Sequence, residues 1–363
     1  MDKHNQALPV LTITGSDSTG ESGVQADIKT ITALGGYAVS AITSVTVQNT
    51  LGIQEFFDLP SAIVVGQIEA IMDDIRPVAV KIGMVRSVEV VDAVTLALTR
   101  HTPKCIVYDP IVVSSRNEQL MLPDVISRIK ARFFKLCTLV VINRQAASRF
   151  LNKKVETVAE MTACANDFLQ YGSEAVLLQE GHTSEETATD VLLIKGVKEP
   201  AYISYPSATE SMHGIGGTLS SAIATYLAQG FTIPESIEKA KAYIRQQRVL
   251  AGCLEGRGSE LYNEFVSLIA LNCQSSSDVR YYADQLNVTS RYLAQVTKRL
   301  AGKTPKMLID DYLLNQAEGL LNGSNKTVQE IAYELGFSSQ AHFTKFFKKA
   351  KNITPREFRN KLI

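Results

Sequence analysis

A glycine-spaced loop at residues 212–221, MHGIGGTLSS, has the composition of an anion-binding site. Its glycines leave backbone N–H groups accessible, and the Thr-Leu-Ser-Ser run is typical of a helix start, where negative charge is favoured. We expect anion contacts at Gly214, Gly216 and Gly217, with His213 beside them as a donor or as a packed loop residue. Acid–base chemistry at this loop would need a proton-accepting side chain, and glycine occupies position 217, where we would look for it first.

Composition excludes several other classes of protein. The 363 residues leave room for one large and one small domain, and the 45% apolar and 20% charged fractions are typical of soluble globular proteins. No apolar run is long enough to span a bilayer, and the first residues lack signal-peptide architecture. The five cysteines are scattered, which argues against a disulfide framework and a zinc site. We therefore expect a cytoplasmic protein that makes no membrane contact.

Charge is distributed unevenly along the chain. From position 271 onward, fourteen lysines and arginines oppose eight acidic residues, a net charge of +6, whereas the preceding residues carry a net charge of −6. A basic tail on an acidic body is expected of a nucleic-acid-binding appendage, although a solvated charged helix would give the same count.

Residues 10 to about 255 alternate short β-branched runs with helical stretches. Helical spacing of apolar residues marks 23–36 and 87–101, for example. The strand-like runs are 9–15, 39–48, 79–85, 105–113, 138–143, 175–181 and 190–196. This alternation predicts an α/β fold with a mainly parallel sheet covered by helices on both faces, with ligands at the carboxyl ends of the strands. We expect this domain to close with a loop at 256–265.

From about residue 275 the strand pattern gives way to short helices. Two helix–turn–helix units are predicted at 278–300 and 327–350, with turns at Asn287 and Gly336, and a longer amphipathic helix at 304–321 joins them. The second helices can be capped by Thr289 or Ser290 and by Ser338 or Ser339.

The paired units resemble the AraC-type DNA-binding domain, whose signature is similar to IAYELGFSSQAHFTKFFKKAKNITPREFR almost end to end. The resemblance places such a domain at 276–363, after a linker at 263–275, and implies DNA as a partner. On each second helix one face is apolar and the opposite face carries residues suited to base edges or phosphates. The expected DNA contacts are Arg291, Gln295, Lys298, Gln340, Thr344, Lys345 and Lys348. Lys351 is a further phosphate contact or a solvated surface charge, and the phenylalanines of the second unit are expected in the core.

Two stretches of the first domain, 12–53 and 81–85, resemble hydroxymethylpyrimidine/phosphomethylpyrimidine kinase of the ribokinase-like superfamily. The resemblance covers residues 10–262 of a domain expected at 1–262, and it implies a pyrimidine-binding pocket. The implied ligand contacts are Asp17, Gly20, Gln48 and Met84, joined by His213. Gly23, Gln25 and Asp27 open the first helix, and Asp27 is interpreted as a charge that complements the helix dipole or as a ligand contact.

The resemblance is weaker where phosphoryl transfer would occur. Gly217 stands where these kinases place cysteine and their pyridoxal-type relatives aspartate, and Ala146 stands where they place an acidic residue associated with metal and phosphates. Gln179 replaces a lysine, with Glu180 beside it as a negative charge near the phosphates, and the run VSSRN at 113–117 loses another lysine. Because phosphoryl transfer depends on positioning and charge neutralisation, these losses argue against a competent ATP site.

The combined interpretation is a homodimeric transcription regulator without a cofactor. Its degenerate kinase-like domain would sense a thiamine-pathway pyrimidine, hydroxymethylpyrimidine or its phosphate, and control DNA binding by the AraC-type domain. The alternative is a bifunctional protein with active hydroxymethylpyrimidine (phosphate) kinase activity, which would need ATP and Mg²⁺. A third interpretation replaces the ligand with a pyridoxal vitamer.

Overall fold

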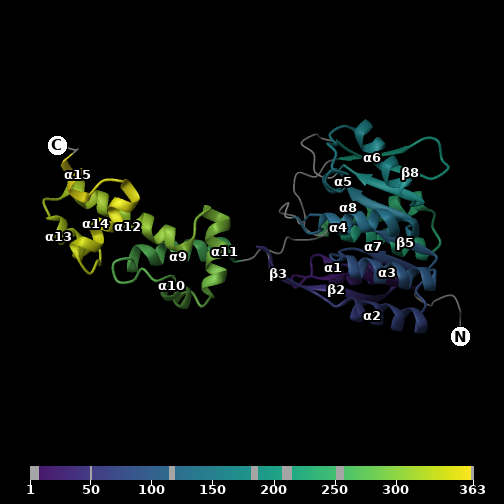
Figure 1. Ribbon diagram of the computed structural model, residues 1–363, viewed down its shortest axis with the longest axis horizontal. Helices are drawn as coiled ribbons and strands as arrows, with labels where there is room; N and C mark the ends of the chain where they lie inside the picture. Colours follow the sequence, from purple (N-terminus) through teal and green to yellow (C-terminus); the bar gives the residue numbers. More distant parts are fainter. Residues whose placement is uncertain are drawn as a thin grey trace. The chain divides into compact units, whose positions relative to one another are not determined.

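The computed structural model describes residues 8–49, 51–113, 119–180, 187–206, 215–250 and 257–360. The chain forms two compact units, Met1–Cys253 and Leu254–Ile363, called here the N-terminal and C-terminal units (Figure 1). None of the helices within the described ranges is long and apolar enough to cross a membrane.

The described strands of the N-terminal unit form one nine-stranded sheet in the order β3-β2-β1-β4-β5-β6-β7-β8-β9. The strands are β1 Pro9–Ser16, β2 Tyr37–Asn49, β3 Gly52–Asp58, β4 Ala79–Ile82, β5 Cys105–Tyr108, β6 Leu139–Asn143, β7 Ala175–Gln179, β8 Thr187–Ile194 and β9 Ala201–Pro206. All neighbouring pairs from β2 to β7 are parallel, and β3, β8 and β9 pair antiparallel at the two ends. The predicted, mainly parallel sheet is confirmed.

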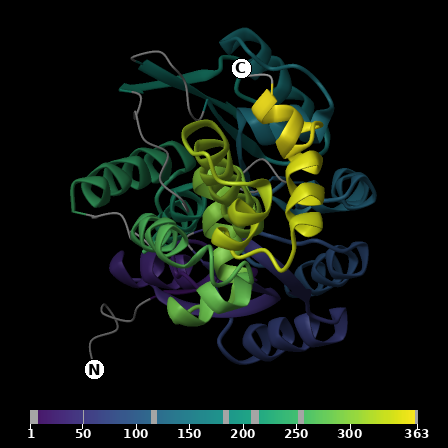
Figure 2. The same cartoon turned by 90° about the vertical axis from the view of Figure 1, so that its left-hand side faces the viewer.

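Helices cover both faces of this sheet because alternate strand residues belong to two different cores (Figure 2). Leu11 contributes to one core and Val10 to the other. The first face carries α2 Ser61–Asp74, α3 Val88–His101, α4 Pro123–Arg128, the π-helix Ile129–Phe133, the 3₁₀ turn Phe134–Leu136, α5 Arg144–Leu151 and α6 Val158–Gln170. The second face carries α1 Gly23–Ala33, α7 Ile215–Ala228 and α8 Ile233–Leu250.

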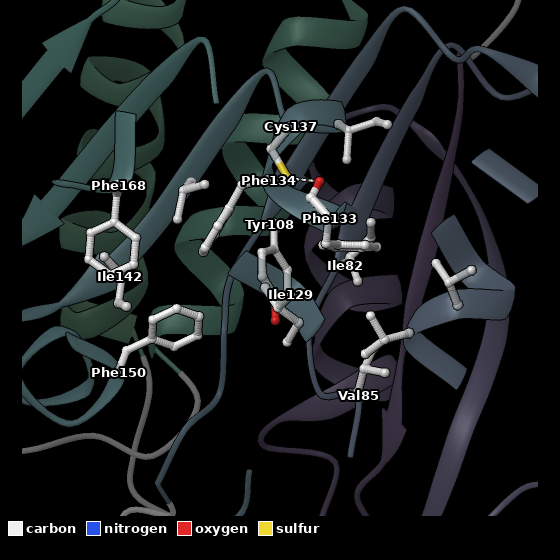
Figure 3. Packing of buried hydrophobic residues seen from close by; sticks show 14 of the residues in the cluster. Ile82, Val85, Tyr108, Ile129, Phe133, Phe134, Cys137, Ile142, Phe150 and Phe168 are labelled. Carbon is white, nitrogen blue, oxygen red and sulfur yellow. Dashed lines mark hydrogen bonds between the residues drawn. The ribbon is translucent and has the colours of Figure 1, made fainter. Parts of the chain in front are cut away.

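An aromatic cluster fixes the middle of the first face (Figure 3). The ring centroid of Phe134 lies 5.5 Å from that of Phe150, 5.6 Å from that of Phe168 and 6.0 Å from that of Tyr108. Tyr108 also meets Phe133 edge to face at 4.9 Å. Such pairs stabilise a core beyond their buried area, and through Tyr108 they hold the last residue of β5, next to Asp109.

Two strands were not predicted from the sequence, and the predicted strands at 79–85 and 105–113 end early, at Ile82 and Tyr108. β3 and β9 lie at the ends of the sheet and carry polar as well as apolar residues, so neither has the continuous apolar pattern of a buried parallel strand. The run at 105–113 is a strand only through Tyr108, because Pro110 follows Asp109 directly.

The described residues of the C-terminal unit contain helices and no strand, as predicted. The helices are α9 Gly258–Asn272, α10 Val279–Gln285, α11 Ser290–Ala301, α12 Pro305–Gly323, α13 Val328–Glu334, α14 Gln340–Lys351 and α15 Pro355–Asn360. The prediction of a loop at 256–265 and a linker at 263–275 is wrong where α9 lies, because Leu261, Phe265 and Ile269 recur at helical spacing and are buried.

The two helix–turn–helix units are confirmed, and their turns use the predicted residues. Asn287 has a φ of 53° between α10 and α11, and Gly336 has a φ of 80° between α13 and α14. Thr289 accepts a hydrogen bond from the Tyr292 amide at the start of α11, and Ser339 caps α14 in the same way.

Candidate functional site

The first strand–helix loop is shaped by the buried Asp17 carboxylate. One oxygen accepts hydrogen bonds from the amide and hydroxyl of Thr19, both at 2.8 Å, and the other accepts from the amide and hydroxyl of Ser22 at 3.0 and 2.7 Å. Gly20 has a φ of 73° and donates its amide to the Asp17 carbonyl. Asp17 thus holds the loop in which it lies, and its direct contact with a ligand stays a prediction.

The start of α1 is packed closely against the end of β1. Gly23 has a φ of 64°, and a Cβ atom there would lie 2.4 Å from the Gly15 carbonyl oxygen, so a larger residue would not fit. The side-chain amide of Gln25 links α1 to the end of β1. Its oxygen accepts a hydrogen bond from the Asp17 amide, and its nitrogen donates one to the Ser16 hydroxyl.

Met84 is fixed by its main chain at the same edge of the sheet. Its amide donates to the Thr14 hydroxyl at 3.0 Å, and its carbonyl accepts from the Thr43 hydroxyl at 2.7 Å. A Cβ atom on Gly15 would lie 2.5 Å from the Met84 methyl carbon. The thioether therefore lies directly against the Gly15 backbone, where it can pack on a flat ring.

Gln48 lies half-buried near the end of β2. The Thr46 hydroxyl lies 2.8 Å from the Ser16 carbonyl oxygen and 3.4 Å from the Gln48 side-chain oxygen. The predicted contacts Asp17, Gly20, Gln48 and Met84 are thus all at the carboxyl ends of the neighbouring strands β1, β2 and β4. This is the edge at which ligands bind in parallel sheets.

The predicted anion loop leads into α7, so Gly216 and Gly217 form part of its first turn. His213 and Gly214 lie outside the described residues. A Cβ atom on Gly217 would be 3.7 Å from an Asp27 carboxylate oxygen and 3.9 Å from the Lys81 ammonium nitrogen, which are ordinary contact distances. A small side chain fits here without a clash, and the glycine leaves the position without any proton-accepting atom.

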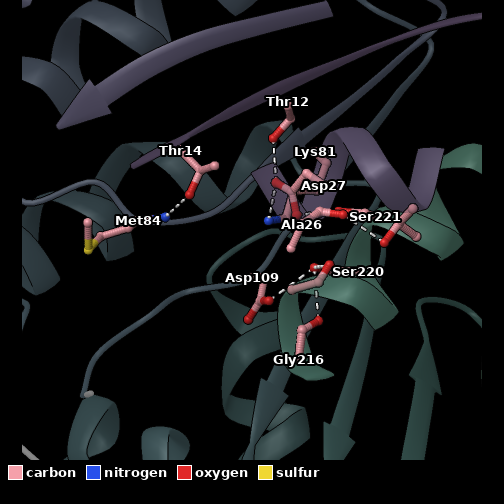
Figure 4. A network of polar contacts seen from close by, with 12 residues as sticks. Thr12, Thr14, Ala26, Asp27, Lys81, Met84, Asp109, Gly216, Ser220 and Ser221 are labelled. Carbon is pink, nitrogen blue, oxygen red and sulfur yellow. Dashed lines mark hydrogen bonds and ion pairs between the residues drawn. The ribbon is translucent and has the colours of Figure 1, made fainter. Parts of the chain in front are cut away.

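A buried polar cluster around Asp27 lies within contact distance of Gly217. Figure 4 shows its side chains, with Gly216, Ser220 and Ser221 beside them. Lys81 donates to Asp27 at 2.7 Å, with 1% and 0% of the two side chains exposed. The Thr12 hydroxyl donates to the same carboxylate oxygen at 2.5 Å, and the Ser221 hydroxyl donates to the other at 2.7 Å. Asp27 therefore joins β1, β4 and α7 to α1, and its interpretation as a charge complementing the helix dipole is wrong.

A second carboxylate, the half-buried Asp109, follows β5 beside the first turn of α7. It accepts a hydrogen bond from Ser220 at 3.0 Å, and a Cβ atom on Gly216 would lie 3.8 Å from the same oxygen. Burial raises the pKa of Asp109, an effect that Lys81 and the Ser220 hydroxyl oppose and Asp27 reinforces. Lys81 and Asp109 were missed by the sequence analysis, although a lone lysine within the apolar run at 79–85 was a usable signal.

The positions implied for metal and nucleotide lie at the ends of β6 and β7. Asn143 caps α5 by accepting from the Ala146 amide at 2.8 Å, and Ala146 is buried in the first core. Gln179 pairs with Asn143 across the two strands. Within the described ranges no three His, Cys, Asp or Glu residues are grouped so that they could hold a metal ion. Ala146 and Gln179 thus offer no carboxylate and no ammonium group at the positions where the resemblance implies them.

Glu180 is engaged with its own neighbours. Its carboxylate lies 3.8 Å from the Arg144 guanidinium and accepts from the Thr189 amide at 2.5 Å, while its amide donates to Asp190. The predicted negative charge beside the phosphates is therefore matched by Arg144, and this ion pair ties the segment after β6 to the segment after β7.

In the first helix–turn–helix unit, α11 buries Leu293 and Val296 and turns Arg291 and Lys298 toward solvent, with Gln295 half-buried. In the second unit, α14 buries Phe343 and Phe347 among the aromatic residues of its core, as predicted, and Phe337 and Phe346 pack partly buried against them.

The outer face of α14 exposes Gln340, Lys345 and Lys348, with Thr344 half-buried. Lys351 instead forms an ion pair with Glu318 of α12 at 2.5 Å. These orientations agree with the predicted faces, while contact of any of these residues with bases or phosphates stays a prediction.

With this geometry in place, the comparisons with known proteins identify the class. Residues 17–259 match the family model described as phosphomethylpyrimidine kinase, and residues 282–361 match a helix-turn-helix domain. The chain belongs to the phosphomethylpyrimidine kinase family and carries an AraC-type helix-turn-helix domain after it. The predicted resemblances and the ribokinase-like fold are confirmed.

Among particular relatives, the thiamine biosynthesis bifunctional protein ThiED of Geobacter sulfurreducens is 37% identical over 71% of this chain, which spans 52% of that protein. The hydroxymethylpyrimidine/phosphomethylpyrimidine kinase of Rhizobium meliloti is 36% identical over 68% of this chain and 94% of its own length. The crystal structure of phosphomethylpyrimidine kinase from Clostridium difficile is 38% identical, with a TM-score of 0.59 over 66% of this chain and 99% of the other. Bacillus subtilis pyridoxal kinase, solved as an ADP complex, is 26% identical with a TM-score of 0.61 over 66% of this chain and 91% of its own.

The buried ion pair gives a direct prediction about stability. Replacing Lys81 by Met removes one partner and leaves the Asp27 carboxylate uncompensated in the core, so the Lys81→Met variant should lose about 3–5 kcal/mol of unfolding free energy. Urea unfolding followed by circular dichroism measures the loss.

Two variants serve as controls. Lys154→Met removes a lysine that is 79% exposed and paired with Glu156 at the surface, and it should cost about 1 kcal/mol or less. The double variant Asp27→Leu/Lys81→Met removes both charges and should recover part of the loss. A Lys81→Met variant as stable as Lys154→Met would contradict the assignment of this pair as a structural centre.

Proposed function

We propose that this protein is a transcription regulator in which the kinase-family domain binds a thiamine-pathway pyrimidine and thereby controls DNA binding. The observation that carries the proposal is Gly217: the first turn of α7 retains its backbone amides, while the side chain that would accept a substrate proton is absent. The attached helix-turn-helix domain supplies an output that does not require chemistry.

The residues retained support recognition. Met84 offers a thioether to a flat ring, Gln48 offers an amide that donates and accepts, and both lie at the same edge of the sheet. The amides of Gly216 and Gly217 can hold an anionic group such as the phosphate of a phosphorylated pyrimidine. The expected ligands are therefore hydroxymethylpyrimidine and its phosphate.

The residues lost argue against nucleotide binding. Ala146 and Gln179 carry no charge, and Arg144 and Glu180 neutralise each other where a triphosphate would need unpaired cations. We infer that Mg-ATP is not bound. We also infer that the protein is cytoplasmic. We infer a homodimer as well, because two copies would present paired helix–turn–helix units to two half-sites of an operator.

The ligand assignment predicts that isothermal titration calorimetry of the full chain will detect hydroxymethylpyrimidine or its phosphate, and will give no heat of binding for Mg-ATP. Because a ligand that binds only the folded state stabilises it, the same pyrimidine should raise the melting temperature. Pyridoxal serves as the competing heterocycle. Tight Mg-ATP binding, or binding of pyridoxal alone, would contradict the proposal.

One observation favours a second candidate function, a bifunctional kinase and regulator. Asp109 places a half-buried carboxylate beside Gly216, and desolvation raises the pKa of this group, so a proton acceptor exists near the anion loop even though position 217 has none.

A kinase assay separates the two functions. We expect no ATP-dependent phosphorylation of hydroxymethylpyrimidine by the unaltered chain, and none by the Gly217→Cys variant, because the other losses remain. Turnover by the unaltered chain that falls at least a hundredfold in Asp109→Asn would establish the kinase interpretation with Asp109 as the base. Circular dichroism would confirm that each variant is folded.

The DNA-binding face gives a further prediction. On DNA fragments selected by this protein, Lys345→Ala should weaken binding and reduce the dependence of log K on log salt by about one, because one phosphate contact is lost. Gln340→Ala should instead relax the preference at one base position by about 1–3 kcal/mol. The exposed Lys195→Ala variant in the N-terminal unit is the matched control, and equal affinities for all three variants would exclude α14 as the DNA-reading helix.

A further inference from the structure

Ser44 on β2 carries a buried hydroxyl that the fold does not use. The residue is 1% exposed, and among the described residues its oxygen has no hydrogen-bond partner. The hydroxyls of the nearby Thr43 and Thr46 both have hydrogen-bond partners. Thr43 donates to the Met84 carbonyl, and Thr46 donates to the Ser16 carbonyl. An unsatisfied buried hydroxyl costs stability, so its presence in the core of the unit requires an explanation.

The position of this hydroxyl is informative. A Cβ atom on Gly15 would lie 2.9 Å from the Ser44 oxygen and 2.5 Å from the Met84 methyl carbon. The hydroxyl and the thioether methyl thus meet at the same point of the Gly15 backbone. Ser44, Thr46 and Gln48 alternate along β2, which directs their side chains to one face of the strand. The unpartnered hydroxyl therefore lies beside Gly15 and Met84, where the ring of the ligand is proposed to bind.

Access to the hydroxyl depends on Met84. The Met84 main chain is held by Thr14 and Thr43, but its side chain is unbranched with three rotatable bonds and ends at the contact with Gly15. A flat ring that entered beside Gly15 would have to displace the methyl group, and the Met84 backbone could stay in place; the ring edge would then lie next to Ser44.

We propose that Ser44 determines specificity for an aminopyrimidine by hydrogen bonding to the polar edge of the ring once the Met84 methyl group has moved. A hydroxyl can donate to a ring nitrogen and accept from the exocyclic amine, so it matches both kinds of atom on that edge. This inference rests on the proposed function, since it names a residue of the same ligand pocket.

The proposal predicts effects of opposite sign on stability and binding. Ser44→Ala removes a hydroxyl without a partner, so the ligand-free variant should unfold at the same or a higher urea concentration than the unaltered chain. The same variant should bind hydroxymethylpyrimidine about tenfold more weakly by calorimetry, because one hydrogen bond to the ligand is lost. A serine with a purely structural role would lower stability and leave the chemical preference of the pocket unchanged.

A ligand analogue isolates the contact. An analogue of hydroxymethylpyrimidine with hydrogen in place of the exocyclic amine should bind the unaltered chain more weakly, and Ser44→Ala should reduce its affinity much less than that of the parent compound. Ser40→Ala, on the same strand four residues earlier and half-buried, is the matched control and should change neither ligand's affinity.

The outcomes separate the two proposals. If the unaltered chain binds hydroxymethylpyrimidine and Ser44→Ala binds it equally well, or if Ser44→Ala weakens both ligands by the same factor while losing stability, the Ser44 proposal is overturned and the ligand-sensing function stands. If the unaltered chain binds no pyrimidine, the proposed function is overturned, and the Ser44 proposal falls with it.

Discussion

The ion pair between Lys81 and Asp27 is the interaction on which the N-terminal unit is built. Two opposite charges without contact to water must satisfy each other and their remaining hydrogen-bonding groups, and Asp27 does so with Lys81 of β4, Thr12 of β1 and Ser221 of α7. The geometry of four elements is therefore set by one carboxylate. The first turn of α7 lies directly above this cluster, and its position follows from the same contacts.

This arrangement explains how the fold can persist with glycine at position 217. The hydrogen bonds of Asp27 are directed to Lys81, Thr12 and Ser221, and a small side chain at 217 would only touch the cluster from outside. The Asp27 cluster, which stabilises the fold, and position 217, which is suited to a proton acceptor, are neighbours. The hydrogen bonds of the cluster do not depend on which residue occupies position 217. On the opposite side of the site, the Arg144–Glu180 pair joins two strand ends by charge neutralisation within the chain. A domain of this kind can therefore keep its shape whether or not position 217 carries a side chain.

In the C-terminal unit, short-range features of the sequence, namely turn residues and helix caps, determine most of the structure. Both helix–turn–helix units end their first helix at a residue with positive φ, Asn287 or Gly336, and start the second with a hydroxyl cap. Position 336 requires glycine for a second reason, because the Cβ atom of any other residue would clash with the Gln274 carbonyl oxygen. The apolar stripe of each second helix is buried, which leaves the polar stripe to face solvent and, by the proposal above, DNA.

The amino-acid sequence by itself determined the elements whose signals are local. The parallel strands could be predicted from continuous apolar runs, and the paired units from turns and caps. Edge strands β3 and β9 lacked such runs, and α9 was hidden by the glycines and polar residues around its start. Only the tertiary structure decided which buried polar groups meet: Asp27 bonds Ser221 from 194 positions away, and Ser44, beside Met84, finds no hydrogen-bond partner within the described part of the chain. Periodicity reports which residues are buried, whereas hydrogen-bond partners depend on how distant strands and helices close around one another.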